Sequence, residues 1–598
     1  MKYSSAMMRW LGGMGYTHCF FVAGGNSMHL LDGARTSMTC IPVVHEVAAG
    51  IAVEYFNEVK AASGRRDRAF ALVTAGPGLT NILSAMTGAF LESRELLVIG
   101  GQVKSTDLAS AGLRQRGIQE VDGISLATPV SVATSRITAP VSKSAFQAVV
   151  SAGGTGRRGP VLLEVCLDAQ GAPVDLAELE RGTQAAPRHL PDPEDGELAQ
   201  LVDVLRHAER PVILLGGGTD RSAVDRALVG LKPSRIPIMT TWNGADRIGS
   251  DDPNYAGRPD TWGQRSANAL IQQSDAVIAL GARLGLQQTG FNWQEFAPLA
   301  TIVQVDIDPA ELRKGHPRVD LAVRADANVV LQRIAESKLP TWDDWADFCQ
   351  RVRTLLPPVE AVNQTADGYL DPYQFVSDLS ELCKPEDVIV PCSSGGSFTV
   401  SMQVFLQKRG QIIVSDKGLA SMGYGLSGAI GAAVAGGRRT ILLEGDGGFS
   451  QNMQELATVA VNRLPVKIFL FSNEGYASIR MTQRNYFDGG YLGCDTATGL
   501  GFPDWPLLFQ AFGIPLVDMR DAKLDSEGFS DAFNATGPTA FLVPVDPEQT
   551  YYPKITSRVT ESGTMQSNPL HLMSPALPEA LAAEVLPYLP DTTREQLT

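Results

Sequence analysis

Residues 440–450 read TILLEGDGGFS, and this stretch decides the fold of the chain. The apolar run at its start is typical of a buried strand, and it ends in a group of glycines around Asp446. A helical pattern follows at residues 452–460. Glycines at a strand-to-helix turn let the backbone approach an anion, and the start of a helix favours a phosphate. The stretch therefore predicts a phosphate-binding turn in a parallel α/β sheet.

A second apolar strand, residues 466–471, ends just before Asn473 and Gly475. Both turns follow the carboxyl ends of strands, which is where open α/β sheets bind ligands. The Asp446 carboxylate, the Asn473 amide oxygen and the Gly475 carbonyl are hard oxygen ligands of the kind that divalent cations prefer. We predict that these three groups hold a cation against a diphosphate.

The whole chain alternates strand-like runs with helical patterns, which is typical of parallel α/β sheets. We predict three parallel-sheet α/β domains, at residues 1–170, 190–340 and 370–546, followed by a C-terminal tail at residues 547–598. The first linker is expected at residues 170–195, which are rich in Pro, Ala, Asp and Glu. The second is expected at residues 341–371, which hold a Trp-rich helix and then two consecutive prolines. Strands are expected at residues 20–22, 41–44, 70–73, 96–99, 161–165, 211–215, 276–280, 302–305, 388–390, 440–443 and 466–471.

Composition excludes several classes of partner. The formal net charge of −15 disfavours nucleic acid polymers and acidic membranes, because both repel an acidic protein. No run approaches the roughly 18 apolar residues that a membrane span needs, and residues 1–5 are unlike a signal peptide. The seven cysteines are scattered without a Cys-x-x-Cys pair, which predicts reduced thiols and a cytoplasmic protein.

The spacing of the glycine turn and Asn473, with residues 448–472 between them, resembles the fingerprint of thiamine diphosphate (ThDP) enzymes. The resemblance implies ThDP and Mg²⁺ as cofactors, with Asp446, Asn473 and Gly475 as metal ligands. It also implies cofactor contacts from a further group of residues, namely Gly445, Gly447, Gly448 and Tyr476. The family usually has a second Asn where this chain has Glu474.

Thiamine chemistry also needs a carboxylic acid beside the aminopyrimidine ring, in an apolar place where burial raises its pKa. Glu46 lies at a strand-to-helix junction and is followed by small apolar residues. Alone, such a residue is more typical of a surface carboxylate that compensates a helix dipole. The resemblance makes Glu46 the activating carboxylate, and it assigns Gly76, Pro77 and Asn81 to the loop on the pyrimidine side.

Two further segments resemble cofactor contacts of the family. Met422 takes the position of the bulky side chain that lies under the cofactor and bends it, although a methionine is also an ordinary core residue. Ser394, Gly395 and Ser397 follow a strand and would cap the diphosphate. Phe398 stands where relatives have a histidine, so this match is less specific.

The resemblance is closest to the acetolactate synthase branch, on residues 156–161 and 119–122. It implies that Gln119 faces the thiazolium and the substrate, and that pyruvate donates a two-carbon unit to a carbonyl acceptor. Ile118 replaces a phenylalanine of that branch. Relatives build each site from the first domain of one chain and the third domain of another, which implies a homodimer or homotetramer. The absence of a His-His pair disfavours simple pyruvate decarboxylases.

The central domain contains three strand-end turns that resemble the FAD site of this branch. They contribute Gly216 and Gly217, then Arg283, then Asp308, which would accept a hydrogen bond from the adenosine portion. Such glycine-rich turns are individually weak signals, and some homologues keep the domain without the flavin. We predict FAD in a structural rather than a redox role.

Four segments depart from ordinary acetolactate synthase and resemble enzymes that transfer the two-carbon unit to nucleotide-linked keto sugars. These segments are residues 289–293, 392–396, 552–555 and 567–571. The C-terminal tail lies where relatives fold a lid over the active site, the alternative being a solvated terminus. The competing functions are acetolactate synthase itself, with pyruvate or 2-oxobutyrate as acceptor, and an FAD-dependent pyruvate oxidase. A catalytically inactive scaffold is disfavoured by Glu46, Asp446 and Asn473.

Overall fold

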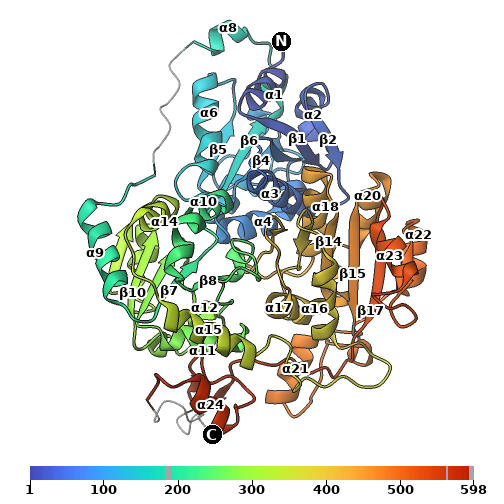
Figure 1. Ribbon diagram of the computed structural model, residues 1–598. Helices are drawn as coiled ribbons and strands as arrows, with labels where there is room; N and C mark the ends of the chain where they lie inside the picture. Colours follow the sequence, from blue (N-terminus) through green and yellow to red (C-terminus); the bar gives the residue numbers. More distant parts are fainter. Residues whose placement is uncertain (182–189, 560–562, 591–598) are drawn as a thin grey trace.

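The computed structural model describes residues 1–181, 190–559 and 563–590. Its strands form three parallel sheets, each covered by helices, and one short two-stranded sheet near the C-terminus (Figure 1). This confirms the predicted fold class. The predicted domain boundaries stay a prediction. Residues 182–189 of the first predicted linker, and residues 560–562 and 591–598 of the tail, lie outside the described residues.

The N-terminal unit contains a six-stranded sheet with the order β2-β1-β3-β4-β6-β5. Its strands are β1 (Tyr16–Phe21), β2 (Thr39–Pro42), β3 (Arg68–Val73), β4 (Leu96–Gln102), β5 (Ala133–Ile137) and β6 (Pro160–Cys166). Its helices include α1 (Tyr3–Gly13), α2 (Met28–Ala34), α3 (Glu46–Ala62), α4 (Pro77–Leu91), α5 (Gly123–Ala127), α6 (Lys143–Ser151), α7 (Leu167–Gly171) and α8 (Leu176–Leu179).

The C-terminal unit repeats this topology. Its sheet has the order β13-β12-β14-β15-β17-β16, so that β12 takes the place of β1, β13 that of β2, and so on along the chain. The strands are β12 (Val388–Val390), β13 (Ile412–Ile413), β14 (Thr440–Gly445), β15 (Val466–Ser472), β16 (Leu516–Asp518) and β17 (Thr539–Pro544). The helices include α16 (Pro372–Leu382), α17 (Gly395–Val404), α18 (Tyr424–Gly436), α19 (Asp446–Phe449), α20 (Leu456–Val461), α21 (Ala477–Tyr486), α22 (Trp505–Ala511) and α23 (Glu527–Asn534).

Helices α3 and α18 are equivalent in the two units and pack against each other. Close approach depends on small residues, because a side chain at Gly431 would lie 2.0 Å from the Ala52 carbonyl oxygen. Gly428 faces the Tyr55 ring, whereas Gly431, nearly one turn further along α18, faces Ala52, which is nearer to the start of α3. The two helices therefore run in opposite directions, and their N-termini lie at opposite ends of the interface.

The central unit contains a five-stranded sheet with the order β11-β10-β9-β7-β8. Its strands are β7 (Pro211–Leu215), β8 (Ile238–Thr240), β9 (Ala276–Leu280), β10 (Thr301–Asp306) and β11 (Leu321–Arg324). Its helices include α9 (Asp195–His207), α10 (Arg221–Leu231), α11 (Arg265–Gln273), α12 (Leu286–Thr289), α13 (Pro309–Leu312), α14 (Ala327–Glu336) and α15 (Asp343–Leu355). The strands bury a continuous apolar core, as parallel strands covered on both faces require.

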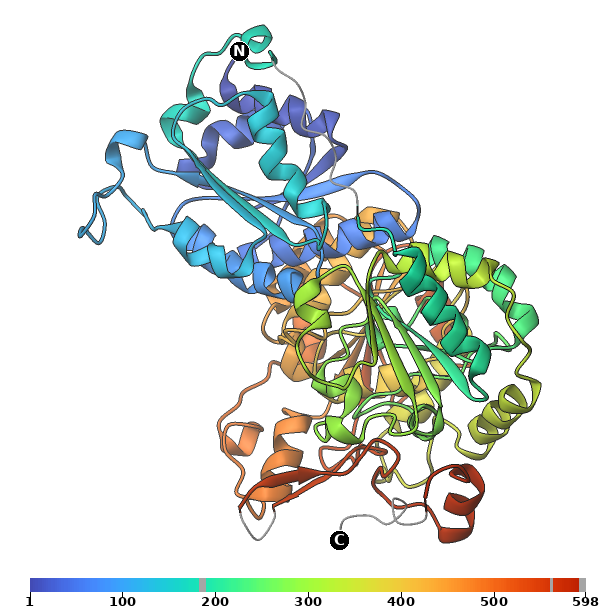
Figure 2. The same ribbon diagram turned by 90° about the vertical axis from the view of Figure 1, so that its left-hand side faces the viewer.

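The C-terminal tail lies along the central unit at the end far from the N-terminal unit (Figure 2). It contains β18 (Ser557–Val559), β19 (Met565–Ser567) and α24 (Glu579–Val585). Tyr551, Leu570 and Leu572 are buried, and Ile555 N–H donates to the Thr261 carbonyl at 2.9 Å. These contacts rule out a solvated terminus for the described part of the tail. Its role as a lid stays a prediction.

The structure also differs from the sequence predictions in its details. The helix predicted at residues 452–460 is broken, because a 3-10 turn at Met453–Glu455 precedes α20. The strand predicted at residues 41–44 ends at Pro42. Eight strands were missed, and most of these are short or lie at a sheet edge, namely β5, β8, β11, β13, β16, β17, β18 and β19. Among the described helices, none is long and apolar enough to cross a membrane.

Candidate active site

The predicted metal ligands meet at the carboxyl ends of β14 and β15. Asp446 is almost completely buried, and its Oδ2 accepts hydrogen bonds from the backbone N–H groups of Asn473 at 3.0 Å and Glu474 at 2.8 Å. Its Oδ1 accepts one from Gly447 N–H at 2.8 Å. The carboxylate is therefore fixed by three backbone donors, which ties the glycine turn to the end of the neighbouring strand.

The Asn473 amide completes an oxygen-rich cluster. The end of this amide that points inward lies 3.1 Å from Asp446 Oδ1 and 2.8 Å from the Gly475 carbonyl oxygen. Oxygen ligands of an octahedral Mg²⁺ lie about 3.0 Å apart when the metal–oxygen distance is about 2.1 Å. A bound cation satisfies all three oxygens, whereas the metal-free chain can rotate the amide so that its NH₂ donates to both acceptors.

The donor set fits a hard divalent cation. Within the described residues, no group of three or more His, Cys, Asp or Glu side chains could hold a metal, so this mixed set of carboxylate, amide and carbonyl stands alone. Burial raises the pKa of Asp446 to about 7, against the opposing effect of its backbone donors. A buried carboxylate of this kind is stabilised by a neighbouring positive charge. The donor set therefore fits a divalent cation such as Mg²⁺.

Several of the predicted cofactor contacts surround this cluster. Ser394 precedes α17, and a side chain at Gly445 would lie 3.6 Å from Ser397 Oγ. Gly447 packs so closely against the Tyr476 ring that a Cβ there would lie 2.4 Å from it. Gly395 has φ +81° and an open space above it, whereas Gly448 lies against Glu444. The structure thus gathers these residues at the ends of β12, β14 and β15.

Met422 lies at the edge of the same cluster and is 37% exposed, so it is not an ordinary core residue. Two contacts hold its loop. Ser393 Oγ donates to the Ser421 carbonyl, and Asn452 Nδ2 donates to the Gly423 carbonyl at 2.7 Å. The side chain that was predicted to lie under the cofactor is therefore presented on a fixed loop beside the diphosphate end.

The pyrimidine-side residues form a second cluster in the N-terminal unit. Glu46 begins α3 and is 8% exposed, and its Oε2 accepts a hydrogen bond from Asn81 Nδ2 at 2.9 Å. Gly76 has φ +63°, and a side chain there would lie 2.4 Å from the Gln119 carbonyl oxygen. Pro77 occupies the first turn of α4. The structure brings these five residues together as predicted from the sequence.

Gln119 itself has a φ of +62° and lies on the connection between β4 and α5, which projects away from the N-terminal unit (Figure 2). Its side chain is exposed, and the neighbouring Ile118 is 84% exposed. A non-glycine residue in the left-handed region is uncommon, and such conformations gather at functional sites. The strained and exposed loop would suit a contact between Gln119 and groups that lie outside the N-terminal unit.

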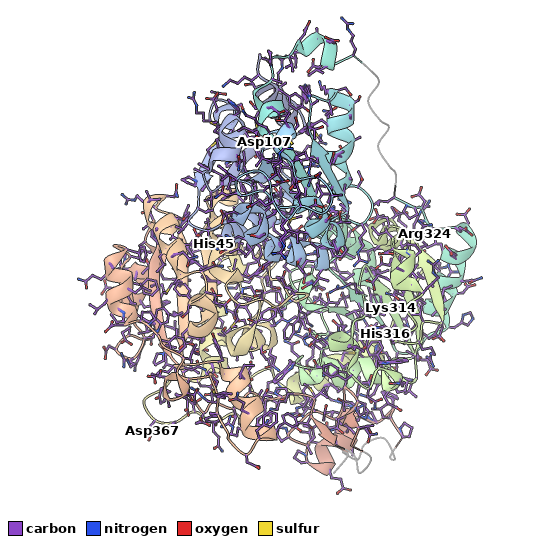
Figure 3. All side chains as sticks on the ribbon, turned by 180° about the vertical axis from the view of Figure 1, so that it is seen from behind. His45, Asp107, Lys314, His316, Arg324 and Asp367 are labelled. Carbon is purple, nitrogen blue, oxygen red and sulfur yellow. The ribbon has the colours of Figure 1, made fainter. Side chains whose placement is uncertain are left out.

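Two residues that the sequence spacing did not single out also support the site. Glu455 Oε1 accepts hydrogen bonds from the backbone N–H groups of Val44 at 3.0 Å and His45 at 2.9 Å, which fixes the chain just before Glu46. His45 lies at the boundary between the N-terminal and C-terminal units (Figure 3). Arg480 donates to the Asn473 carbonyl at 3.3 Å and to the Pro547 carbonyl at 2.8 Å. An isolated Glu or Arg in a helical segment gave no sequence signal for either role.

The two clusters lie at opposite ends of the α3–α18 interface. Glu46 begins α3, and Met422 lies just before α18, and these helices run in opposite directions. Nine residues of helix separate Glu46 from Tyr55, which contacts the first turn of α18, and this corresponds to about 13 Å of rise. One chain therefore keeps its pyrimidine-side and diphosphate-side residues apart.

A cavity of about 620 Å³ opens between the central unit and the other two. Its lining includes Gly217 and Arg283 from the predicted FAD turns, and Lys314 and His316, which lie close together in the central unit (Figure 3). Asp308 is absent from the lining and pairs with Arg157 at 2.6 Å, whereas Asp306 lines the cavity. Gly216 lies just behind the lining, against Gly281.

Two residues that line this cavity each carry a buried polar atom that finds no hydrogen-bond partner among the described residues. These atoms are Trp242 Nε1 and Asn243 Oδ1. Five cationic side chains line it, namely Arg157, Arg158, Arg283, Lys314 and Lys417, together with five acidic ones, namely Glu92, Asp220, Asp306, Glu311 and Asp326. Buried polar atoms without partners are costly, and arginine and lysine side chains beside glycine-rich turns suit a diphosphate. The cavity therefore fits a dinucleotide-like ligand such as FAD.

Comparison with known proteins gives the class of the chain. Three domain families of the thiamine pyrophosphate enzymes match the chain. The N-terminal TPP binding domain matches residues 1–126, and the central domain matches residues 198–334. The C-terminal TPP binding domain matches residues 394–543. Thiamine pyrophosphate is another name for ThDP. The chain belongs to the ThDP-dependent enzymes.

Several similar proteins indicate the branch of the ThDP enzymes to which the chain belongs. The chain is 29% identical to acetolactate synthase isozyme 2 large subunit of Escherichia coli, covering 90% of this chain and 93% of that protein. It is 27% identical to a probable acetolactate synthase large subunit of Methanocaldococcus jannaschii, with coverage of 92% and 93%. It is also 28% identical to the maize protein acetolactate synthase 1, chloroplastic, with coverage of 91% and 85%. The chain is therefore a ThDP enzyme of the acetolactate synthase branch, which transfers a two-carbon unit.

Proposed function

We propose that the protein decarboxylates pyruvate and transfers the two-carbon unit to a carbonyl acceptor, in a site that Glu46, Asp446 and Asn473 define. The observation that carries this proposal is the pairing of two features. The Asp446, Asn473 and Gly475 oxygens have the spacing of a Mg²⁺ site, and a buried Glu46 is held by Asn81. The similarity to acetolactate synthases along most of the chain supports pyruvate as the donor.

Each residue has a separate task in this proposal. Asp446, Asn473 and Gly475 would hold Mg²⁺ against the diphosphate, and Met422 would support the cofactor from the side. ThDP, when bound, supplies the carbanion chemistry of decarboxylation and carbon–carbon bond formation. Glu46 would carry the activating proton on its carboxyl group, because Asn81 occupies only Oε2. Gln119 would orient the substrate.

A complete site requires a second copy of the chain under this proposal. Glu46 and Met422 lie at opposite ends of the α3–α18 interface, and the Gln119 loop projects outward. A two-fold pair of chains would place Glu46 and Gln119 of one copy beside Asp446 and Met422 of the other. We therefore propose a homodimer, or a homotetramer built from such dimers.

The proposed acceptor is a nucleotide-linked keto sugar, and acetolactate synthase with pyruvate or 2-oxobutyrate as acceptor is the second candidate. Contacts among the segments that depart from ordinary acetolactate synthase support the sugar. Leu570 of segment 567–571 lies 3.4 Å from an ideal Cβ at Gly290, in segment 289–293. The ring of Tyr551, the residue just before segment 552–555, lies 2.6 Å from an ideal Cβ at Gly396, in segment 392–396. The relatives favour acetolactate synthase.

The deciding experiment incubates the purified protein with pyruvate, ThDP and Mg²⁺ and a panel of acceptors that includes keto-sugar nucleotides. Products are identified by mass spectrometry. We expect a sugar nucleotide that has gained a two-carbon unit. Acetolactate as the sole product would sink the sugar proposal, and consumption of oxygen with pyruvate alone would point to the oxidase.

We also propose FAD in the cavity of the central unit, in a structural role. The arginine and lysine side chains of the lining, and the buried Trp242 and Asn243 atoms that lack a partner among the described residues, support this ligand. The absorption spectrum of the purified protein tests it directly. A flavin spectrum that pyruvate does not bleach is the expected result, and a protein that binds no added FAD would refute the proposal.

A further inference from the structure

Two cysteines of the N-terminal unit lie directly opposite each other on neighbouring strands. Cys19 of β1 pairs in register with Cys40 of β2 in the parallel ladder. Residues paired in this way direct their side chains to the same face of the sheet, and the strands lie about 4.8 Å apart. Both cysteines accordingly pack into the same apolar layer, beside Leu30 and Met38.

The two thiols differ in exposure. Cys19 is completely buried, whereas Cys40 is the one cysteine of the seven that is only partly buried. The hydrogen bond with Cys19 lowers the pKa of Cys40 to about 7, and burial raises the pKa of Cys19 well above its usual value. A thiol with a lowered pKa and access to solvent is the form that oxidants attack, and a buried neutral thiol is not.

We propose that Cys19 and Cys40 form a peroxide-sensitive dithiol, in which Cys40 reacts first and Cys19 closes an intramolecular disulfide. In the first step the Cys40 thiolate attacks hydrogen peroxide, which gives a sulfenic acid at Cys40 and releases hydroxide. In the second step the Cys19 sulfur displaces the hydroxyl group from Cys40, and water leaves with the Cys19 proton. Two electrons pass from the thiols to the peroxide.

The fold allows this bond. A disulfide needs Cα atoms roughly 4.4–6.8 Å apart, and paired residues on adjacent strands meet that range. β2 is a four-residue strand at the edge of the sheet, so it can move toward β1 without disturbing a further strand. The chain continues from β2 through residues 43–45 into α3, so the bond would tie down the segment that leads to Glu46.

The test uses the full-length protein, reduced, freed of reductant and treated with a small excess of hydrogen peroxide. Intact mass should fall by about 2 Da, and peptide mapping should join Cys19 to Cys40. Cys40→Ser should abolish this change, and Cys19→Ser should leave a Cys40 sulfenic acid that dimedone traps. Cys166→Ser, a buried control on β6 of the same sheet, should behave as the wild type.

A second readout is hydrogen exchange, which should slow across residues 39–45 after oxidation and recover with dithiothreitol. This measurement keeps the test decisive if Cys19→Ser fails to fold. A folded protein that loses no mass under peroxide would overturn the proposal. A disulfide that joins two chains, or that forms equally in Cys40→Ser, would overturn it as well.

Discussion

Asp446 is fixed by three backbone N–H donors, so its carboxylate would serve as the proposed metal ligand without rearrangement. Two of these donors come from the turn after β15, so the glycine turn and Asn473 position each other. Glu46 depends in the same way on Asn81. At the scale of single residues, the site is a set of side chains that neighbouring loops hold in place.

Replacing Glu46 by Gln should remove the activating proton while keeping the hydrogen bond from Asn81. We expect the rate of pyruvate decarboxylation to fall by about 10²- to 10⁴-fold, which is the usual contribution of general acid–base catalysis. Steady-state kinetics would measure the decarboxylation rate, and exchange of the ThDP C2 proton would measure the activation step. Glu584→Gln, an exposed change on α24, is the control. Wild-type exchange in Glu46→Gln would exclude the proposed role.

Replacing Asp446 by Asn keeps the size of the side chain but removes the charge that a cation needs. We expect ThDP affinity in the presence of Mg²⁺ to fall by at least about 100-fold, because even the outer partners of metal sites contribute 10- to 100-fold. Titration calorimetry would show this, and chelation of the metal from the wild type should have the same effect. Asp367→Asn, on an exposed loop (Figure 3), should bind normally. Equal affinities would remove Asp446 from the site.

The packing of α3 against α18 is the main feature at the scale of elements. These helices occupy equivalent places in the N-terminal and C-terminal units, and glycines let their backbones approach closely. The opposite directions of the two helices separate the clusters around Glu46 and Met422. The arrangement of these two helices therefore keeps the two clusters of one chain apart, and this separation is the basis of the proposed site between copies.

Gly431→Ala should test that packing. A methyl group there would lie 2.0 Å from a backbone oxygen, which cannot move aside as a side chain can. We expect a loss of about 1–3 kcal/mol, as is typical of overpacked cores, and a lower midpoint of thermal unfolding by calorimetry. Gly12→Ala on α1 meets nothing within 4 Å and is the matched control. Unchanged stability in Gly431→Ala would contradict the close contact.

The tail is held on the central unit by Arg265, which is almost completely buried. It pairs with Glu360 through two hydrogen bonds of 2.8 and 2.9 Å, and it also donates to the Met573 carbonyl at 3.1 Å and the Pro575 carbonyl at 2.9 Å. Removing a buried charge from such a network leaves its acceptors without partners.

Arg265→Ala should therefore release the tail. Limited proteolysis, followed by mass spectrometry, should show cleavage near Tyr551 and Tyr552 at least about tenfold faster than in the wild type, because buried contacts normally protect that segment. Arg333→Ala, an exposed change on α14, should leave the rate unchanged. Equal protection in both variants would mean that other contacts hold the tail.

The whole molecule is a pair of similar units joined to a central unit, and the proposed site lies between copies. This predicts complementation between two inactive variants. Glu46→Gln and Asp446→Asn chains, mixed in equal amounts under conditions that exchange subunits, should recover about a quarter of wild-type activity. Half of the dimers are then mixed, and each mixed dimer has one intact site. Activity that stays at the level of either variant alone would refute a shared site.

The amino-acid sequence alone was enough to assign the class of enzyme and to propose its chemistry. Asp446 and Asn473 could be recognised because a metal–diphosphate site needs particular residues at the ends of adjacent strands, and chain spacing records that requirement. Parallel strands also leave a strong pattern, since they are buried on both faces. Short edge strands such as β5, β13 and β16 leave little pattern, and they were missed.

The contacts between segments distant in the chain became known only from the folded structure. Several contacts join residues whose spacing in the chain carries no signal. They are the contacts of Glu455 with Val44, Tyr551 with Gly396, Asp308 with Arg157, and Cys19 with Cys40. The direction of α3 against α18 is of the same kind. Local sequence specifies local conformation and ligand chemistry, whereas these pairings depend on how whole sheets pack, which no short stretch records.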